Sequence, residues 1–303
     1  MKIALSLCLL GMGVAVSGCA LVDRTAIAVL YKKADLPAAQ VLNDIPYGDP
    51  ALPQQQLDLF LAEGKDRPVF IFVHGGGWTK GDKGLRVGGA DVYGNIGRFY
   101  AEHGIDVAVI NYRLQPAVPW QDQVDDVARA TAWVRAHIAE DGGDPKRLFI
   151  GGHSAGAQLA AHVALDPVPL EHYGLSPSNI CGVITVSGAG FDLADQQTYA
   201  LGAPLAKYQQ RFGETTDWQR EASPVSYVRP GAPPFLILYA GGETKALQRQ
   251  AQRLAEVLST NGVPHQIVVV PGQSHTRIVP ALSRPDRTAG PAIVNFIQTT
   301  ACQ

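Results

Sequence analysis

A regular alternation of short apolar runs with longer amphipathic segments is the feature that most constrains how this chain can fold. The apolar runs are continuous and rich in β-branched residues, as expected for strands covered on both faces. They occupy residues 69–73, 107–110, 148–150, 183–186, 235–238 and 267–270. Between them, segments 120–138 and 247–258 place their apolar residues on one helical face. This order predicts an α/β fold with a mostly parallel central sheet and helices on both faces, in which ligands bind at the carboxyl ends of the strands.

A long connection at residues 188–231 interrupts the alternation. It contains aromatic residues, prolines and a predicted helix near residues 201–211. Insertions of this length usually form a cap over the binding site. We therefore predict a small cap insertion here, and a peripheral helical excursion without substrate contact is the alternative.

The segment Gly152-His153-Ser154-Ala155-Gly156 follows the predicted strand at 148–150 and precedes a helix-compatible run. In a Gly-x-Ser-x-Gly turn between strand and helix, the glycines leave room for a serine in a strained backbone conformation. The serine hydroxyl then lies at a helix N-terminus, where the backbone dipole favours developing negative charge. The pattern is short enough to arise by chance, but its place between strand and helix predicts Ser154 as a nucleophile.

A second glycine-rich turn, His74-Gly75-Gly76-Gly77-Trp78, directly follows the predicted strand at 69–73. Glycines let backbone N–H groups approach a substrate oxygen without side-chain interference, as an oxyanion hole requires. We predict the backbone amides of Gly76, Gly77 and Ala155 as its donors. Taken alone the turn is also compatible with a plain tight loop, and the downstream serine motif makes that alternative less favoured.

Together these motifs resemble those of α/β-hydrolase carboxylesterases, over about residues 47–298. The resemblance is carried by His74-Gly75-Gly76-Gly77-Trp78, Asn111-Tyr112-Arg113-Leu114, Gly142-Gly143-Asp144-Pro145 and Gly152-His153-Ser154-Ala155-Gly156-Ala157. The sequence is most similar to the feruloyl-esterase-like and prenylcysteine-methylesterase-like branch, which is related to hormone-sensitive-lipase-type esterases and kynurenine formamidases. The resemblance implies an α/β-hydrolase fold, a small-molecule ester substrate and a catalytic triad in the order serine, acid, histidine.

His275 is the predicted general base of this triad. It lies in the loop 271–276, directly after the predicted strand at 267–270, where the family places its catalytic histidine. The other histidines belong to the oxyanion loop, to the serine motif, or to helices and the starts of elements. We therefore expect His275 to take the proton of Ser154.

The acid is predicted at Glu243, in the turn 240–244 after the penultimate strand. The family usually has a Gly-x-x-Asp turn here, so this chain departs from it by one methylene group. A carboxylate is needed to fix the imidazole tautomer and to stabilise the imidazolium. Asp192, after the predicted strand at 183–186, is the alternative acid, because some hydrolases supply it from that loop.

These residues predict the hydrolysis of carboxylic esters through an acyl-enzyme on Ser154. A formamidase or another amide hydrolase would use the same machinery and is an alternative enzyme. A catalytically silent binding protein that keeps the fold is an alternative of another class. Such proteins typically lose the serine or the histidine, whereas this chain has all three triad residue types in order.

The composition fits one catalytic domain behind a short leader. The chain has 303 residues, of which 46% are hydrophobic and 17% charged, so it can bury a large core. The formal net charge of −2 and the lack of a long basic run favour neither nucleic acid nor a polybasic membrane contact. Cysteines and histidines show no spacing typical of a metal site, so we expect neither metal nor cofactor. No pattern indicates an oligomeric state.

The first residues have the anatomy of an export signal. Lys2 precedes an apolar run at 3–16, which ends in the small residues Ser17 and Gly18. The run is shorter than the roughly 17 to 25 residues that span a bilayer, so a retained transmembrane helix is the less favoured alternative. We predict a signal peptide at residues 1–18.

The residue after this signal is a cysteine. The segment 16–19, Val-Ser-Gly-Cys, resembles the bacterial lipobox, in which the cysteine is diacylated and becomes the new N-terminus. The resemblance implies lipid attachment at Cys19. From the residues that follow we expect a tether at 19–46, with a short helix near 21–39, and a catalytic domain at 47–303. Two acyl chains are enough to hold a protein at a membrane surface. Ala20, rather than an aspartate, favours the outer membrane if the host has one.

The remaining cysteines leave one question open. Cys8 would leave with the signal and Cys19 would carry lipid, so Cys181 and Cys302 remain. They can form a disulfide in an oxidising compartment. Because Cys181 opens an apolar strand run, a buried free thiol is at least as strong an alternative.

Overall fold

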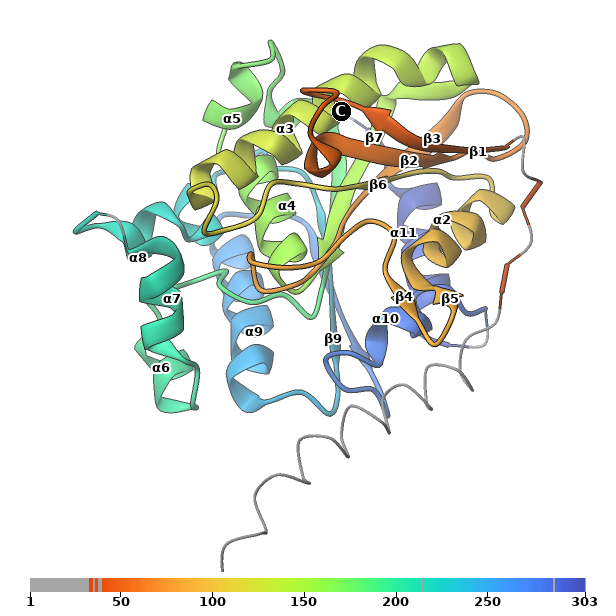
Figure 1. The fold of residues 1–303 in the computed structure, drawn as a ribbon. Helices are drawn as coiled ribbons and strands as arrows, with labels where there is room; N and C mark the ends of the chain where they lie inside the picture. Colours follow the sequence, from red (N-terminus) through yellow and green to blue (C-terminus); the bar gives the residue numbers. More distant parts are fainter. Residues whose placement is uncertain (1–32, 35, 38–39, 214, 286, 303) are drawn as a thin grey trace, which may run out of the picture.

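The computed structural model describes residues 33–34, 36–37, 40–213, 215–285 and 287–302 (Figure 1). The predicted signal peptide, the lipid site at Cys19 and most of the predicted helix near 21–39 lie outside the described residues. In the part of the chain that is described, no helix has both the length and the apolar character needed to cross a membrane.

An eight-stranded sheet forms the centre of the molecule (Figure 1). Its order is β1-β2-β6-β3-β7-β8-β9-β10, where β1 and β2 pair antiparallel, β2 pairs antiparallel with β6, and the remaining neighbours are parallel. The strands are β1 Val41–Pro46, β2 Gln56–Phe60, β3 Arg67–Val73, β6 Asp106–Ile110, β7 Gly143–His153, β8 Ile180–Val186, β9 Phe235–Ala240 and β10 His265–Val270. Each apolar run predicted as a strand lies inside one of these, so the mostly parallel sheet is confirmed.

The two antiparallel strands at one edge were not predicted. β1 lies within residues 19–46, where the sequence predicts a tether, and it pairs antiparallel with β2. β1 has the sequence Val-Leu-Asn-Asp-Ile-Pro and is mostly exposed. An edge strand of this kind lacks the continuous apolar run by which the inner strands are recognised.

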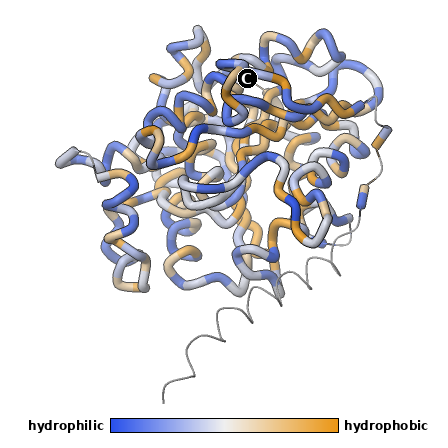
Figure 2. The backbone as a smooth tube through the Cα atoms, viewed as in Figure 1, coloured by the Kyte–Doolittle hydropathy of each residue, from blue (hydrophilic) through white to orange (hydrophobic). Residues whose placement is uncertain are grey.

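Helices cover both faces of the sheet, and the sheet separates the core into two layers (Figure 1). The first face carries α3 Trp120–His137, α4 Ala155–Leu165 and α9 Lys245–Thr260, and the second carries α2 Val92–Glu102, α10 Ile278–Ala281 and α11 Ala289–Thr299. Strand β3 shows the alternation that produces this: Ile71 packs in the first layer, and Phe70 and Phe72 pack in the second. Figure 2 shows the hydrophobic residues concentrated along the central strands.

The cap segment, residues 188–231, is a chain of short helices beside the first face. It contains α6 Gln196–Ala200, α7 Leu205–Phe212, α8 Trp218–Glu221 and the 3₁₀ helix η5 Pro224–Tyr227. The helix expected near 201–211 is α7, which begins only at Leu205, because Gly202 and Pro204 lie before it and separate it from α6. Smaller elements elsewhere are η2 Pro53–Gln55, β4 Arg86–Val87, β5 Ala90–Asp91, η3 Ile138–Asp141, α5 Val168–Glu171 and η4 Pro177–Asn179.

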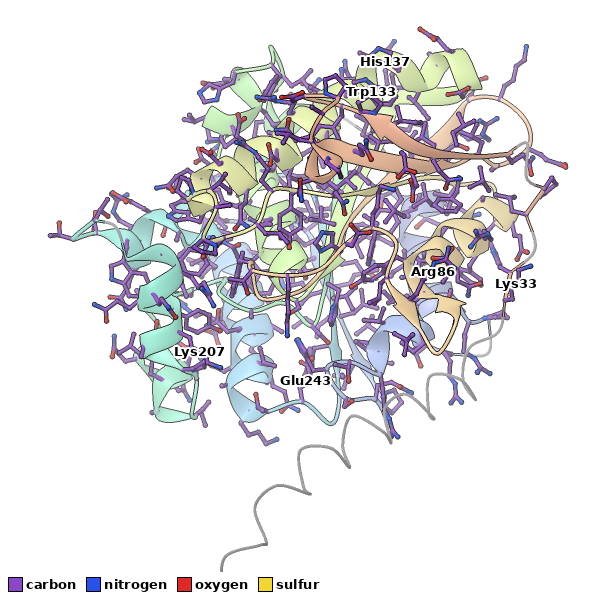
Figure 3. The ribbon with its side chains drawn as sticks, in the orientation of Figure 1. Lys33, Arg86, Trp133, His137, Lys207 and Glu243 are labelled. Atoms are coloured by element: carbon purple, nitrogen blue, oxygen red, sulfur yellow. A yellow bond between two sulfur atoms is a disulfide. The ribbon has the colours of Figure 1, made fainter. Side chains whose placement is uncertain are left out.

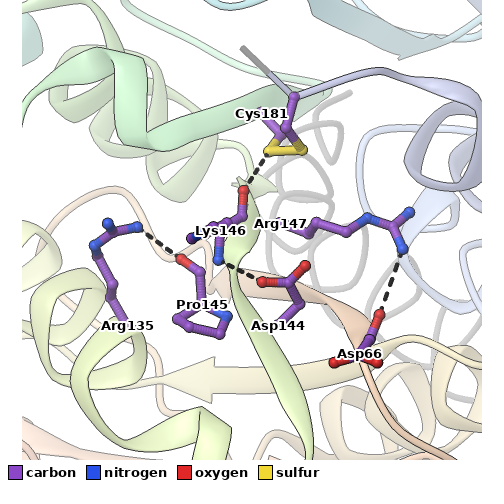
Figure 4. The surroundings of a disulfide bond; sticks show 8 residues. Asp66, Arg135, Asp144, Pro145, Lys146, Arg147 and Cys181 are labelled. Carbon is purple, nitrogen blue, oxygen red and sulfur yellow. Dashed lines mark hydrogen bonds between the residues drawn. A yellow bond between two sulfur atoms is a disulfide. The ribbon is translucent and has the colours of Figure 1, made fainter.

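Cys181 and Cys302 form a disulfide, with Cα atoms 4.6 Å apart across a sequence separation of 121 residues. This settles the question that the sequence left open in favour of the paired form. The bond joins the start of β8 to the C-terminal segment after α11, and it lies beside Lys146 of β7 (Figure 4).

Candidate active site

Ser154 occupies the turn between β7 and α4. β7 ends at His153, α4 begins at Ala155, and Ser154 has φ 55° and ψ −116°. A Cβ atom on Gly152 or Gly156 would overlap the carbonyl oxygen of Val73 in the adjacent strand β3. Glycine is therefore required on both sides of the serine, because the turn is pressed against β3.

Ser154, His275 and Glu243 lie in one hydrogen-bonded row. His275 Nε2 is 2.9 Å from Ser154 Oγ, and His275 Nδ1 is 3.0 Å from Glu243 Oε1. The carboxylate only accepts, so Nδ1 carries the proton and Nε2 is left to accept from the serine hydroxyl. The arrangement can remove a proton from Ser154 and stabilise the imidazolium that results.

Two neighbouring loops supply the histidine and the carboxylate. His275 lies between β10 and α10, and Glu243 lies between β9 and α9, where Figure 3 labels it. The Gly241 amide donates to Val270 O and the Gly242 amide donates to the carbonyl of residue 273, both at 2.9 Å, which joins the two loops. The Glu243 side chain is fully buried, so its carboxylate is shielded from water and faces the imidazole.

Asp192, the alternative acid, is engaged elsewhere. Its Oδ2 atom accepts from Arg253 Nε at 2.8 Å, and its Oδ1 atom accepts from the Ala194 amide at 3.0 Å. Of the two carboxylates, it is Glu243 that contacts His275.

The glycine-rich turn after β3 lies directly against the serine. Gly76 has φ 136° and Gly77 has φ 62°, which favour glycine, and a Cβ on Gly75 would lie 3.3 Å from Ser154 Cβ. In the described part of the chain, the amides of Gly76, Gly77 and Ala155 have no hydrogen-bond acceptor. These amides are thus free to donate to an oxygen of a bound molecule.

Several side chains that the sequence did not single out hold this turn in place. The Trp78 carbonyl accepts from the Gln115 amide at 3.0 Å and from Gln123 Nε2 at 2.7 Å. The Trp78 indole donates to Gln158 Oε1 at 3.0 Å. Gln158 is one turn beyond Ser154 on α4, a spacing that is visible in the sequence but does not reveal which side chain it meets.

His74 supports the turn without entering the row of reacting groups. Its ring stacks on Tyr112 with centroids 4.3 Å apart, and the Tyr112 hydroxyl donates to its carbonyl oxygen at 3.1 Å. Burial lowers the pKa of His74 from 6.5 to about 4, so the ring is neutral near pH 7. Tyr112 belongs to the Asn-Tyr-Arg-Leu motif, which therefore contributes to the shape of the turn.

The cap segment contacts Trp78, the last residue of the glycine-rich turn, and Gln158 of α4. Tyr208 and Phe212 of α7 lie edge-on to the Trp78 ring, with centroids 6.1 and 5.0 Å away. Gln158 Nε2 donates to the carbonyl of Ala222 at 3.0 Å.

Within the described ranges, no group of three histidine, cysteine, aspartate or glutamate residues could hold a metal ion.

The chain is similar to known proteins over most of its length. The family model BD-FAE matches residues 57–258. The chain is 33% identical over 236 residues to esterase LipQ of Mycobacterium tuberculosis, covering 74% of this chain and 54% of the relative. It is 29% identical over 255 residues to a probable isoprenylcysteine alpha-carbonyl methylesterase, ICMEL1, of Arabidopsis thaliana, covering 78% of this chain and 51% of the relative. The chain thus spans about half the length of these curated relatives.

Among solved structures, esterase B from Lactobacillus rhamnosis superposes with a TM-score of 0.74 at 21% identity. The match covers 94% of this chain and 91% of that one. At this identity the likeness concerns the fold, and it confirms the predicted α/β-hydrolase architecture.

Proposed function

The chain belongs to the BD-FAE family, and from that premise we propose that it is a serine hydrolase that cleaves carboxylic esters through an acyl-enzyme on Ser154. The observation that carries the proposal is the row of contacts from Ser154 through His275 to Glu243, at 2.9 and 3.0 Å. The names of the curated relatives, which are esterases and methylesterases, favour an ester over an amide substrate.

In the proposed reaction, Ser154 Oγ attacks the ester carbonyl while His275 Nε2 takes the hydroxyl proton. The amides of Gly76, Gly77 and Ala155 donate to the oxyanion of the tetrahedral intermediate. The bond to the alcohol oxygen then breaks, and His275 returns the proton to the leaving alcohol. A water molecule, deprotonated by His275, then attacks the acyl-enzyme carbonyl. The bond to Ser154 Oγ breaks, the acid is released, and His275 returns the proton to Ser154 Oγ, so no cofactor is needed.

The test is a p-nitrophenyl ester series from acetate to long acyl chains, measured on the wild type, Ser154→Ala and Ser178→Ala. Ser178 is an exposed serine in η4 and serves as the matched control. We expect Ser154→Ala to lose about 10⁴-fold or more in kcat, and Ser178→Ala to retain full activity. A wild-type rate equal to that of Ser154→Ala would contradict the proposal.

Two further measurements separate the alternative functions. An aryl formamide turned over faster than every ester would indicate an amide hydrolase. Failure of a fluorophosphonate probe to label Ser154 would indicate a binding protein that keeps the fold. Within the ester series, preference for short acyl chains would indicate a small esterase, and preference for long chains a lipase.

We also propose that the chain is exported and anchored to the cell envelope by lipid on Cys19. The lipobox-like segment 16–19 supports this, and so does the Cys181–Cys302 disulfide, because disulfides persist mainly in oxidising compartments. Labelled fatty acid should be incorporated into the wild type expressed in a bacterium and not into Cys19→Ser. Equal labelling of both proteins, or recovery of both in the soluble fraction, would contradict the anchor.

A further inference from the structure

His153, the residue before the proposed nucleophile, lies between two loops on which the proposed reaction depends. It is the last residue of β7 and is only 6% exposed. On one side its Nδ1 atom faces the glycine-rich turn 74–78. A Cβ atom added to Gly75 would lie 2.8 Å from this nitrogen. On the other side its ring centroid is 4.9 Å from that of His275, and its Nε2 atom is 2.8 Å from the backbone carbonyl oxygen of His275.

The partner of Nε2 fixes the chemistry of this ring. A carbonyl oxygen only accepts, so His153 Nε2 carries a hydrogen and donates it to the His275 carbonyl. Burial, and next the charge of His275, lower the pKa of His153 from 6.5 to about 3. The ring is therefore a neutral donor at neutral pH, with its unprotonated Nδ1 towards Gly75.

The His275 carbonyl belongs to a short loop whose position decides where the imidazole lies. That loop is held on the carboxylate side by the Gly242 amide, and at its end by the Ile278 amide, which donates to Ser274 O at 3.0 Å. His153 holds it on the serine side. Since the imidazole must meet Ser154 at 2.9 Å and Glu243 at 3.0 Å together, a small backbone shift would disturb at least one of these contacts.

We propose that His153 is a positioning residue. The Nε2–H group of His153 holds the backbone carbonyl of His275, so that the His275 imidazole keeps its hydrogen bond to Ser154. The inference rests on the proposed function. It assigns a role to the variable residue of the Gly-x-Ser-x-Gly motif, whose side chain lies between the glycine-rich turn and the loop of the general base.

The experiment compares two substitutions at this position. His153→Leu has a similar volume but no hydrogen to donate, whereas the side-chain amide of His153→Gln can again donate to the His275 carbonyl. We expect His153→Leu to lose about 10²-fold in kcat with KM changed by no more than about threefold, because misplacement of a reacting group by about 1 Å has an effect of this size. His153→Gln should recover kcat to within about tenfold of the wild type.

His162→Leu is the matched control. His162 is a buried histidine of α4 that contacts Trp120 and Tyr227 and lies outside the proposed machinery. Its loss should lower the Tm and leave kcat per folded molecule unchanged. Rates are normalised to folded protein by near-ultraviolet circular dichroism, and His153→Met, which also lacks the hydrogen, replaces the leucine variant if that one does not fold.

Two results would overturn the inference: a donor-less variant with kcat within about threefold of the wild type, or a glutamine variant as slow as the donor-less one. Failure of the proposed function would be recognised separately, because the wild type would then be no faster than Ser154→Ala. The ratio between the two His153 variants reports only on the positioning role.

Discussion

Glu243→Gln tests the carboxylate of the proposed triad with almost no change in shape. The Glu243 side chain is fully buried, and its Oε1 atom is 3.0 Å from His275 Nδ1. If the new amide nitrogen faces Nδ1, the ring must adopt the other tautomer and can no longer accept the Ser154 proton. If the amide oxygen faces Nδ1, the tautomer is kept but the negative charge that stabilises the imidazolium is lost.

The size of the second effect follows from the distance between the charges. Two unit charges about 4 Å apart interact by about 4 kcal/mol at an effective dielectric constant of about 20. Since each 1.36 kcal/mol is about tenfold in rate, the loss approaches 10³-fold. We therefore expect kcat to fall by about 10²- to 10³-fold, less than for Ser154→Ala.

The assay is kcat and KM for p-nitrophenyl butyrate, with thermal unfolding to confirm the folded state. Asp192→Asn is the control, because Asp192 pairs with Arg253 at 2.8 Å and does not contact His275. Its kcat should stay within about threefold of the wild type. The reasoning is refuted if Asp192→Asn is the more damaging change, or if Glu243→Gln keeps the wild-type rate.

Three other changes have expected outcomes. Removing the disulfide by double alanine substitution should lower the free energy of unfolding by about 2–5 kcal/mol, given its separation of 121 residues; a loss below about 1 kcal/mol in urea unfolding would contradict this. Burial lowers the pKa of His74 to about 4, and burial together with His275 lowers the pKa of His153 to about 3, against 6.5 ordinarily. As the pH falls below 6.5, these two histidines therefore take up protons in the unfolded chain before they do so in the folded one. The free energy of unfolding should then drop by about 1.4 kcal/mol per pH unit for each histidine between about pH 6 and 5. Equal urea midpoints at the two pH values would contradict this. Gly76→Ala should lower kcat by about 10²-fold or more, whereas Gly64→Ala, at φ 94° with open space around it, should not; equal rates would exclude the turn from the oxyanion hole.

The sequence predicted the inner sheet well because its strands are buried on both faces. β3 and β8 are buried at every residue, so their hydrophobicity is continuous and easily recognised. β1 escaped prediction because it is an edge strand with mostly exposed residues. Its identity depends on pairing with β2, which is a tertiary contact and leaves no local pattern.

The residues brought together at the candidate site differ in how far the sequence could place them. Ser154 and His275 each follow a recognisable strand, and parallel strands end at the same edge, so their proximity could be predicted. Glu243 and Asp192 both follow such strands as well, and only the direction of each side chain separates them. The disulfide was undecided for a similar reason, since the burial of Cys181 fits a free thiol and a bonded one equally.

His153 and Gln158 show what a motif leaves out. His153 ends a strand, and its ring meets the backbone carbonyl of His275, which lies 122 residues further along the chain. Gln158 is four residues beyond Ser154, yet its partners, the Trp78 indole and the Ala222 carbonyl, come from distant segments. A Gly-x-Ser-x-Gly pattern predicts where the hydroxyl lies, but not which side chains hold the surrounding loops.

The contacts of the cap segment indicate that it is fixed at both ends. Near its start, Gln250 of α9 accepts from the Asp192 amide at 2.9 Å and donates to Thr198 Oγ1 at 2.8 Å. Near its end, Gln158 donates to Ala222 O. Both glutamines are buried, so breaking either set of bonds would leave buried polar groups unsatisfied, at about 1–3 kcal/mol each. Because α9 begins directly after the Glu243 turn and α4 directly after Ser154, any large cap movement would pull on the helices that position the carboxylate and the nucleophile. The cap segment is therefore better suited to act as a fixed wall of the site than as a hinged lid.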